Sequence, residues 1–562
     1  MIPATPRATL AASVETLAQR SGAWVAVPVA EKVDHLRTVM SRFLEVSDDL
    51  VADALTAKGL DPSYGAEDWV SGPISFLRTC RFLAATLDGI ERTGRVPLPD
   101  EAFGERPDGR VTVDVIPGDR WDRVQYPRWS GRVWMEPGIP LAAAREHLGS
   151  IYTKPGSATP AVAAVLGAGN VASIAPLDLV HKLFVEGHVA IVKFSPINEY
   201  VGPHVEHAFA PLADAGFVRF AYGGPDVGEY LVRHPLVDEV HITGSELTHD
   251  AIVFGTGDEG RARKARNEPI LAKRITSELG NVSPVIVVPG DWSSRALAWQ
   301  ARHVATQVVQ NGGYNCNAAK VVLLSRLWRQ RDEFVEAVAA CLASRPPRPA
   351  YYPGSEARYE RAIVGAPRVR VLGQHGDGCL APTILEGFDA SAEAAAITEE
   401  AFCQVVAIVD LPEAAPGRFL GAVVDFCNER LRGTLNATIL VDPRTARVPE
   451  TGVARAVERL RYGSIGINVW AAAAFPLGVA PWGAYPGHRL DDVQSGIGFV
   501  HNARLIDRPE KTVIRAPFVM FPAPPWSVFH RRATAALRRV ARFEADPGPL
   551  RLAAMLGPSL RP

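Results

Sequence analysis

The stretch of sequence that decides the fold runs from residue 160 to residue 194 and reads PAVAAVLGAGNVASIAPLDLVHKLFVEGHVAIVKF. It begins with a short apolar run, continues through an amphipathic segment over 176–187 and ends in a second apolar run over 188–194. Short β-branched runs that are apolar on both faces predict buried strands, and the segment between them predicts a helix. A strand, a helix and a second strand in this order predict a parallel sheet, because parallel neighbours need a crossover connection.

The same alternation of strands and helices continues along the chain to about residue 470. Further strands are expected at 218–224, 237–245, 283–288, 320–324, 404–411, 435–442 and 464–470, and helices at 201–216, 226–235, 292–310 and 331–344. Alternating strands and helices are typical of α/β domains whose sheets are covered on both faces. The prediction is an α/β protein with two doubly wound, Rossmann-like parallel-sheet domains in series.

Three other regions differ from this alternation. Residues 31–95 have apolar residues at helical spacing and predict a helical layer, whereas residues 96–150 are rich in Pro, Gly, Trp and Arg and predict an extended excursion with short strands. Residues 527–546 read as a basic amphipathic helix, and its apolar face is mostly alanine and valine. That face favours docking on the protein surface or at an interface over a role at a membrane.

Composition narrows the class of partner and the compartment. The chain has 60 basic and 61 acidic residues, so no overall positive field favours binding to nucleic acid. Its six cysteines contain no C-x-x-C pair, which argues against a zinc site or a disulfide scaffold and favours a reducing, cytoplasmic location. No apolar stretch approaches the roughly 20 residues of a membrane span, so stable membrane insertion is not expected.

One short motif looks like a nucleotide-binding fingerprint and is rejected. Residues 255–260, GTGDEG, fit G-x-G-x-x-G, but the fingerprint works only between a strand and a helix. Here charged residues without an apolar stripe follow it. The interpretation is a flexible surface insertion.

Nine short motifs occur in a fixed order over more than 300 residues. They are GAGN (167–170), VKFSP (192–196), DVGEYL (226–231), HITGSE (241–246), TSELGNVSP (276–284), NGGYNCNAAK (311–320), TEEAFCQVV (398–406), PWG (481–483) and SGIG (495–498). This succession resembles the aldehyde dehydrogenase superfamily, most clearly over 160–500. The GAGN motif, where the family usually has Pro-Trp-Asn, is similar to the branch that reduces acyl-CoA.

The resemblance implies three catalytic residues. Cys316 matches the family's nucleophile, Glu278 its general base and Asn170 its oxyanion-binding asparagine. The residue types suit these roles, because a thiolate is a strong nucleophile, a carboxyl among apolar neighbours has a raised pKa, and an amide can donate to an oxyanion. Tyr314 stands where the family has glutamine, and Asn281 where it has a second glycine.

The resemblance also implies NAD or NADP as cofactor and no metal site. The implied cofactor-binding residues are Lys193, Ser195, Gly228, Thr243, Gly244, Ser245, Leu279, Gly280, Glu400 and Phe402. Pro196 replaces a glutamate that would repel the 2′-phosphate of NADP, so both cofactors remain candidates. Asn468, Trp470 and Trp482 are expected to line or support the substrate channel.

A domain division follows from the same resemblance. Residues 1–275 are expected to form a cofactor-binding domain with an excursion over 96–160 that includes bridging strands, and residues 276–480 a catalytic domain. Residues 481–518 are expected to return to the cofactor domain and to include an oligomerisation strand that crosses to a neighbouring subunit, and residues 519–562 form a C-terminal helical extension. A small bridging β element and a homodimer or homotetramer are therefore predicted.

The predicted function is NAD(P)-dependent oxidation of an aldehyde to a carboxylic acid through a thiohemiacetal and a thioacyl group on the cysteine. Two alternatives stay open. One is a reductase that takes its acyl group from an acyl-CoA or another acyl thioester onto the same cysteine. The other is a catalytically silent relative.

Overall fold

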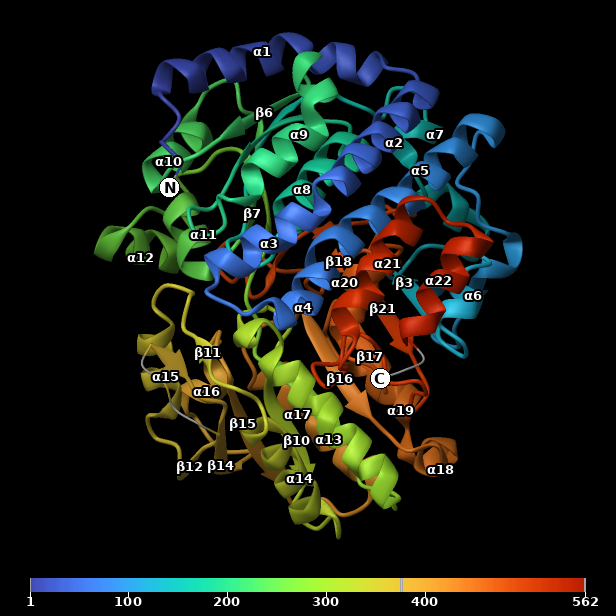
Figure 1. Ribbon diagram of the computed structural model, residues 1–562, viewed down its shortest axis with the longest axis vertical. Coiled ribbons are helices and arrows are strands. Elements are labelled where there is room, and N and C mark those ends of the chain that lie inside the picture. Colours follow the sequence, from blue (N-terminus) through green and yellow to red (C-terminus); the bar gives the residue numbers. More distant parts are fainter. Residues whose placement is uncertain (1, 374–375, 377, 560–562) are drawn as a thin grey trace.

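The computed structural model describes residues 2–373, 376 and 378–559, and it contains two large sheets (Figure 1). The first sheet has six strands in the order β19 (Gly496–Ile497), β8 (Arg274–Glu278), β7 (Glu239–Thr243), β4 (Val162–Leu166), β5 (Val189–Lys193) and β6 (Val218–Ala221). All neighbours are parallel except β19, which runs antiparallel to β8. Chain order runs in opposite directions on the two sides of β4, so the carboxyl ends of β4 and β7 form a topological switch point.

Helices cover both faces of this first sheet. They include α8 (Ile174–Val180), α9 (Val201–Asp214), α10 (Pro225–Arg233) and α11 (Glu246–Val253), with α1 (Arg7–Ala26) and α2 (Val29–Glu45) from the N-terminal region. Helix α1 packs on β5 and β6, and α2 packs on α9. Every residue of β5 is buried, which is why its sequence is apolar without alternation.

The second sheet has eleven strands. Their order is β1 (Phe103–Glu105), β2 (Val111–Ile116), β3 (Ser130–Met135), β21 (Pro509–Arg515), β17 (Ser464–Ile467), β16 (Asn436–Leu440), β9 (Ser283–Val287), β10 (Ala319–Ser325), β15 (Val405–Leu411), β14 (Thr383–Asp389) and β12 (Arg368–Val371). The strands from β21 to β14 are parallel, and α13 (Ser294–Val309), α14 (Arg331–Ala343) and α17 (Pro416–Glu429) lie beside them in Figure 1. The predicted fold class, with two parallel-sheet α/β units, is confirmed.

The predicted bridging strands lie in this second sheet. Strands β1, β2 and β3 form an antiparallel edge, and β21 joins them to the parallel strands by pairing with β3 on one side and β17 on the other. In this structure β21 pairs with strands of its own chain, and its expected crossing to a neighbouring subunit stays a prediction. The domain boundaries stay predictions, and the two sheets meet between Glu278 and Ser283.

The C-terminal extension packs on the N-terminal helices. It forms α21 (Ala533–Ala545) and α22 (Pro549–Ser559), and α21 contacts α4 (Gly65–Trp69), α5 (Ser75–Thr93) and α2, as Figure 1 shows for the red and blue helices. Glu544 of α21 is fully buried and pairs with Arg78 at 3.0 Å and Arg81 at 2.8 Å on α5. Asp122 also pairs with Arg78, at 2.7 Å. A buried charge needs such partners, so α21 is fixed to α5.

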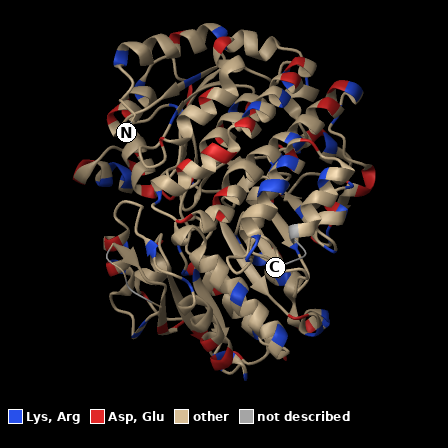
Figure 2. Cartoon of the chain, viewed as in Figure 1, with Lys and Arg blue, Asp and Glu red and all other residues tan. Residues whose placement is uncertain are grey.

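The distribution of charged residues on the surface agrees with the balanced composition. Figure 2 shows basic and acidic residues interspersed over the helices of this face. No helix in the described part of the chain is long and apolar enough to cross a membrane.

Residues 255–260 were expected to form a flexible insertion. They instead enter a regular helix, α12 (Gly257–Arg266), which lies mostly at the surface. Acidic residues in its first turn and basic residues in its last turn complement the helix dipole.

Candidate active site

The loop that carries Cys316 is shaped by a tight turn after α13. Asn311, Gly312 and Gly313 have φ values of 52°, 67° and 73°, so three successive residues adopt the left-handed conformation. A Cβ atom at Gly313 would lie 2.5 Å from the carbonyl of Cys403, which excludes any larger residue there. The turn ends the helix and directs Cys316 into the space between the two sheets.

Side-chain hydrogen bonds fix this loop to its neighbours. The Asn311 amide donates to the Asn170 carbonyl at 3.0 Å, and the Asn170 amide donates to the Tyr314 carbonyl at 3.0 Å. Lys320 Nζ donates to the carbonyls of Gly313 and Cys403 at 3.0 and 2.8 Å. These contacts join the loop after β4, the loop before β10 and the loop before β15, so Cys316 and Asn170 are held in one framework.

The half-buried Cys316 and the buried Glu278 lie side by side. Glu278 is the last residue of β8 and is 3% exposed, and its carboxyl group lies next to the Cys316 thiol. Burial raises the pKa of Glu278 to about 8. Burial, and then the neighbouring Glu278 carboxylate, raise the pKa of Cys316 well above its usual value. Near neutral pH the pair is therefore mainly in its protonated form, and losing the Glu278 proton creates a base beside the thiol.

A cavity of about 360 Å³ opens above Cys316. Asn170, Gln310, Asn315 and Asn317 line it near the thiol. Because an amide nitrogen carries two hydrogens, the Asn170 side chain can donate one to the Tyr314 carbonyl and still offer the other to an oxygen in the cavity. The arrangement gives a nucleophile, a base and an amide donor around one point, which is the set that acyl chemistry on a thiol requires.

The predicted cofactor-binding residues lie along the carboxyl ends of the strands of the first sheet. Lys193 ends β5 and Ser195 follows it, while Thr243 ends β7 and Gly244 and Ser245 follow. Burial lowers the pKa of Lys193, and the Asp226 carboxylate on α10 opposes that change. In open parallel sheets this edge is where nucleotides bind, especially at the switch point.

The residues at this edge differ in whether their polar groups are already hydrogen-bonded within the protein. Thr243 Oγ1 donates to Asp178 at 3.0 Å, and Ser245 Oγ caps α11 by accepting from the Thr248 N–H at 3.2 Å. Gly228 packs α10 close to β4, because a Cβ atom there would lie 3.8 Å from Leu166. Gly244 is exposed and leaves its backbone open to a ligand.

Glu400, Gly280 and Phe402 meet beside the cysteine loop. A Cβ atom at Gly280 would lie 2.1 Å from Glu400 Oε2, so only glycine admits this carboxylate. Burial raises the pKa of Glu400 to about 7, and Oε1 has no hydrogen-bond partner among the described residues. Phe402 packs edge-on against Tyr352 at 4.9 Å. A buried acceptor without a partner fits the ribose hydroxyls of a nicotinamide nucleotide, and the aromatic ring beside it fits the nicotinamide ring.

The remaining predicted residue, Leu279, is buried, and its N–H donates to the Ser495 carbonyl at 2.8 Å.

Four residues singled out from the sequence have clear places. The Tyr314 ring is buried against Tyr351 and Tyr352, so its side chain supports the loop from beneath. Trp470 lines the cavity, and Trp482 is buried where its N–H favours the charged form of Glu278. Asn468 instead bonds the backbone N–H and carbonyl of Val441 at 2.8 and 3.0 Å, which makes it a structural residue.

Two parts of the cavity wall were not predicted from the sequence. Residues 124–129 and a set between 517 and 556 line it together with the predicted residues. The only sequence signals were the Pro- and Trp-rich composition of these segments and the apolar face of the C-terminal helix. Neither signal says which surface a segment covers.

Comparison with known proteins agrees with this geometry. Residues 162–349 match the model of the aldehyde dehydrogenase family. N-succinylglutamate 5-semialdehyde dehydrogenase of Novosphingobium aromaticivorans is 26% identical over 164 residues, which are 29% of this chain and 32% of that protein. Aldehyde dehydrogenase LUC3 of a Fusarium species is 27% identical over 124 residues, 22% of this chain and 24% of that one. The matches therefore span a third or less of these curated relatives.

Solved structures share the fold over nearly the whole chain. An NADP-dependent enzyme of E. coli superposes with a TM-score of 0.62 at 18% identity, covering 91% of each chain. The NADP-dependent glyceraldehyde-3-phosphate dehydrogenase of Bacillus halodurans, complexed with NADP, gives a TM-score of 0.60 at 17% identity and covers 91% of this chain and 92% of that one.

Proposed function

Because residues 162–349 match the aldehyde dehydrogenase family, we propose that this chain oxidises an aldehyde to a carboxylic acid with NAD or NADP, using Cys316 as the nucleophile. The observation that carries the proposal is the position of Cys316. The residue lines a cavity together with Asn170, and its thiol lies next to the Glu278 carboxyl group. The two other thiols in half-buried positions outside the site, Cys341 and Cys379, are not among the residues that line this cavity.

In this mechanism ionised Glu278 takes the thiol proton as the Cys316 sulfur attacks the aldehyde carbonyl. Asn170 and the backbone N–H of Cys316 donate to the oxyanion that forms. A nicotinamide cofactor supplies the hydride acceptor when bound. Once the acyl group is held on Cys316 as a thioester, Glu278 gives up the thiol proton to solvent and is again a base. It then takes a proton from the water that attacks the thioester, the Cys316 thiolate leaves, and the acid is released.

Lys193, Glu400 and Phe402 would hold that cofactor. Lys193 would contact the hydroxyls of the adenosine ribose, Glu400 those of the nicotinamide ribose, and Phe402 the nicotinamide ring. The unpartnered oxygen of Glu400 supports this assignment. Similarity to structures complexed with NADP supports a nicotinamide nucleotide, and the Asp226 carboxylate beside Lys193 favours NAD over its 2′-phosphate form.

A second candidate reaction uses the same cysteine. Glu278 keeps its proton below about pH 8, so at neutral pH water is a poorly activated nucleophile and a thioester on Cys316 can persist. A thiol such as that of coenzyme A would then exchange with the acyl group, and in reverse the enzyme would reduce an acyl thioester to an aldehyde.

The test is nicotinamide absorbance with a panel of aldehydes, NAD and NADP, and with acyl-CoA in the reducing direction. We expect Cys316→Ala to lose activity by at least about 10⁴-fold, since it removes the nucleophile. Cys341→Ala is the matched control, because Cys341 lies on α14 and should leave the rate unchanged. An inactive wild-type protein in both directions, or an active Cys316→Ala variant, would contradict the proposal.

A further inference from the structure

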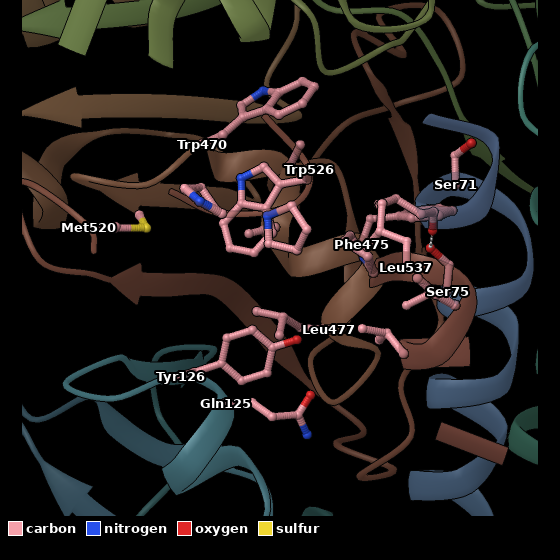
Figure 3. Close-up of a pocket in the computed structure, with 18 of the residues that line it drawn as sticks. Ser71, Ser75, Gln125, Tyr126, Trp470, Phe475, Leu477, Met520, Trp526 and Leu537 are labelled. Atoms are coloured by element: carbon pink, nitrogen blue, oxygen red, sulfur yellow. Dashed lines mark hydrogen bonds between the residues drawn. The ribbon is translucent and has the colours of Figure 1, made fainter. Parts of the chain in front are cut away.

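The lining of the cavity at Cys316 combines amides with a larger apolar surface. The amides come from Asn170, Gln310, Asn315 and Asn317. Much of the remaining lining consists of apolar side chains, of which Figure 3 shows Trp470, Phe475, Leu477, Met520, Trp526 and Leu537. Such a site matches a molecule with a polar carbonyl end and an apolar remainder.

The two serine hydroxyls on the wall are already hydrogen-bonded within the protein. Ser71 Oγ donates to the Glu67 carbonyl at 2.8 Å, and Ser75 Oγ donates to the Val70 carbonyl at 2.6 Å. Arg128 is the one charged residue among those that line the cavity in the described part of the chain, and it is exposed. Gln125 is the exception on the wall, because its buried Nε2 has no acceptor among the described residues. The wall therefore offers little to a charged or sugar-like substrate.

The upper side of the cavity comes from the C-terminal part of the chain. We call residues 517–556 the roof segment; it contributes Pro517, Met520, Phe521, Pro522, Ala523, Pro524, Pro525, Trp526, Leu537, Val540, Met555 and Leu556 to the lining. Leu537 is 3% exposed and Val540 8%, so these two residues of the apolar face of α21 line the cavity while being almost fully covered by protein.

The roof segment is fixed in place. Trp526 packs edge-on against Trp129 of the opposite wall at 5.7 Å, and Phe543 packs against Trp121 at 5.8 Å. The buried Glu544 holds α21 to α5 through Arg78, and Arg78 also lies over the ring of Tyr126, which lines the cavity. Roof and wall are thus parts of one packed unit, and the shape of the cavity is set before a ligand enters.

We propose that the roof segment makes this site selective for aldehydes or acyl groups with a long apolar tail, with Leu537, Val540 and Trp526 as specificity-determining residues. This inference rests on the proposed function, because the tail is positioned by a carbonyl at Cys316. A cavity of about 360 Å³ is within the size range of sites for drug-sized ligands, so it exceeds what a short aldehyde fills.

The first experiment measures kcat/KM for straight-chain aldehydes from acetaldehyde to dodecanal. Each methylene buried in the cavity should raise kcat/KM by about fourfold until the cavity is full. Leu537→Trp should shorten the preferred chain and lower the dodecanal-to-butanal ratio by at least tenfold. Leu537→Ala should move the preference to longer or bulkier tails, so the pair of variants still tests the idea if one fails to fold.

The control is Leu550→Trp, which places the same bulky residue on α22 at a position that is 88% exposed, and it should leave the chain-length profile unchanged. A flat profile in a wild-type enzyme whose activity depends on Cys316 would overturn the inference and leave the proposed function standing.

A binding measurement separates the two claims when no aldehyde is oxidised. Calorimetric titration with dodecanoate and with butanoate needs no catalysis. Tighter binding of dodecanoate, weakened tenfold or more by Leu537→Trp and unaffected by Leu550→Trp, would support the apolar site while the dehydrogenase proposal fails. Equal binding of both acids, or an unchanged Leu537→Trp variant, would overturn the inference itself.

Discussion

The floor and the roof of the cavity are built by different parts of the fold. The floor comes from residues next to the ends of parallel strands in both sheets: Asn170 follows β4, Glu278 ends β8, and Cys316 precedes β10. The roof comes from a segment that follows the last strand of the second sheet and packs on helices from the start of the chain. The floor therefore depends on where the strands of the two sheets begin and end, whereas the roof is an addition to a sheet already complete.

The two regions also differ in whether their buried carboxyl group has a cationic partner. On the floor, Glu278 is buried without a cation, and its pKa rises to about 8. In the roof, Glu544 is buried just as deeply but meets two arginines. An unpaired carboxyl is a reactive group that costs stability when ionised, and a paired one is a structural anchor. The predictions below test this contrast.

Among the variants that test this contrast, the largest effect is expected at Glu278. Glu278→Gln should lower the rate by about 10²- to 10⁴-fold, because it removes the base. In the wild type the rate should rise with pH through about 8 as Glu278 loses its proton, and this limb should vanish in the variant. A pH–rate profile of both proteins checks the assignment, and an unchanged limb in Glu278→Gln would assign it to another group.

Raising the pH toward 8 should increase the rate of the wild-type enzyme but lower its folding stability, and both effects come from Glu278. The folded state raises the pKa of Glu278 from 4.5 to about 8, so between these values the unfolded chain is ionised while the folded one keeps its proton. Stability is therefore lost as pH rises toward 8, by roughly 3–6 kcal/mol in total. Thermal unfolding of Glu278→Gln should match the wild type near pH 4 and exceed it near pH 8.

In the roof, Glu544→Ala should destabilise the protein by about 3–5 kcal/mol, because Arg78 and Arg81 each lose a buried partner. Asp48→Ala is the matched control. It breaks the ion pair of Asp48 with Arg538 on the same helix, but both side chains are about half exposed, so a loss below about 1 kcal/mol is expected. Denaturant unfolding compares the two, and equal losses would remove Glu544 as the anchor.

Asn170→Ala tests the floor again. Loss of one oxyanion donor should lower kcat by about 10²- to 10³-fold. The Asn170 amide also bonds the Tyr314 carbonyl, so the rate of Cys316 alkylation should be measured beside kcat. Reduced kcat with unchanged alkylation supports oxyanion binding, whereas a changed alkylation rate indicates a displaced loop.

The smallest effect concerns the cofactor edge, away from both floor and roof. Asp226→Asn removes a negative charge near Lys193 and should raise the NADP-to-NAD ratio of kcat/KM by about threefold to tenfold. Glu229→Gln, on the same helix, changes an exposed glutamate paired with Arg233 and serves as the control. Equal shifts in both variants would point to a general charge effect.

The sequence predicted the floor far better than the roof, for a physical reason. Buried parallel strands must be apolar on both faces, so they stand out in the sequence, and the residues just after them lie at one edge of the sheet. The places of Asn170 and Glu278 follow in this way, whereas Cys316 precedes a strand of the other sheet and was joined to them only by the family resemblance. The catalytic roles of these residues remain proposals.

The roof could not be derived in this way. The C-terminal helix was expected to dock on a surface or at an interface, because its sequence is basic and its apolar face small. That face closes the cavity, and the acidic Glu544 near its end is the buried anchor. The place of β21 was equally hidden, since an apolar strand says nothing about whether its partner strand belongs to the same chain.

The pairing of β21 within its own chain has a consequence for assemblies of this protein. The strand joins the sheet that holds the cysteine loop, and the chain that continues from it covers the same cavity. Cys316 and the segment that covers the cavity thus come from one and the same copy. When a Cys316→Ala copy is mixed with a Leu537→Trp copy, the mixture should not regain the wild-type activity toward dodecanal, and that activity should fall in proportion to the fraction of variant copies.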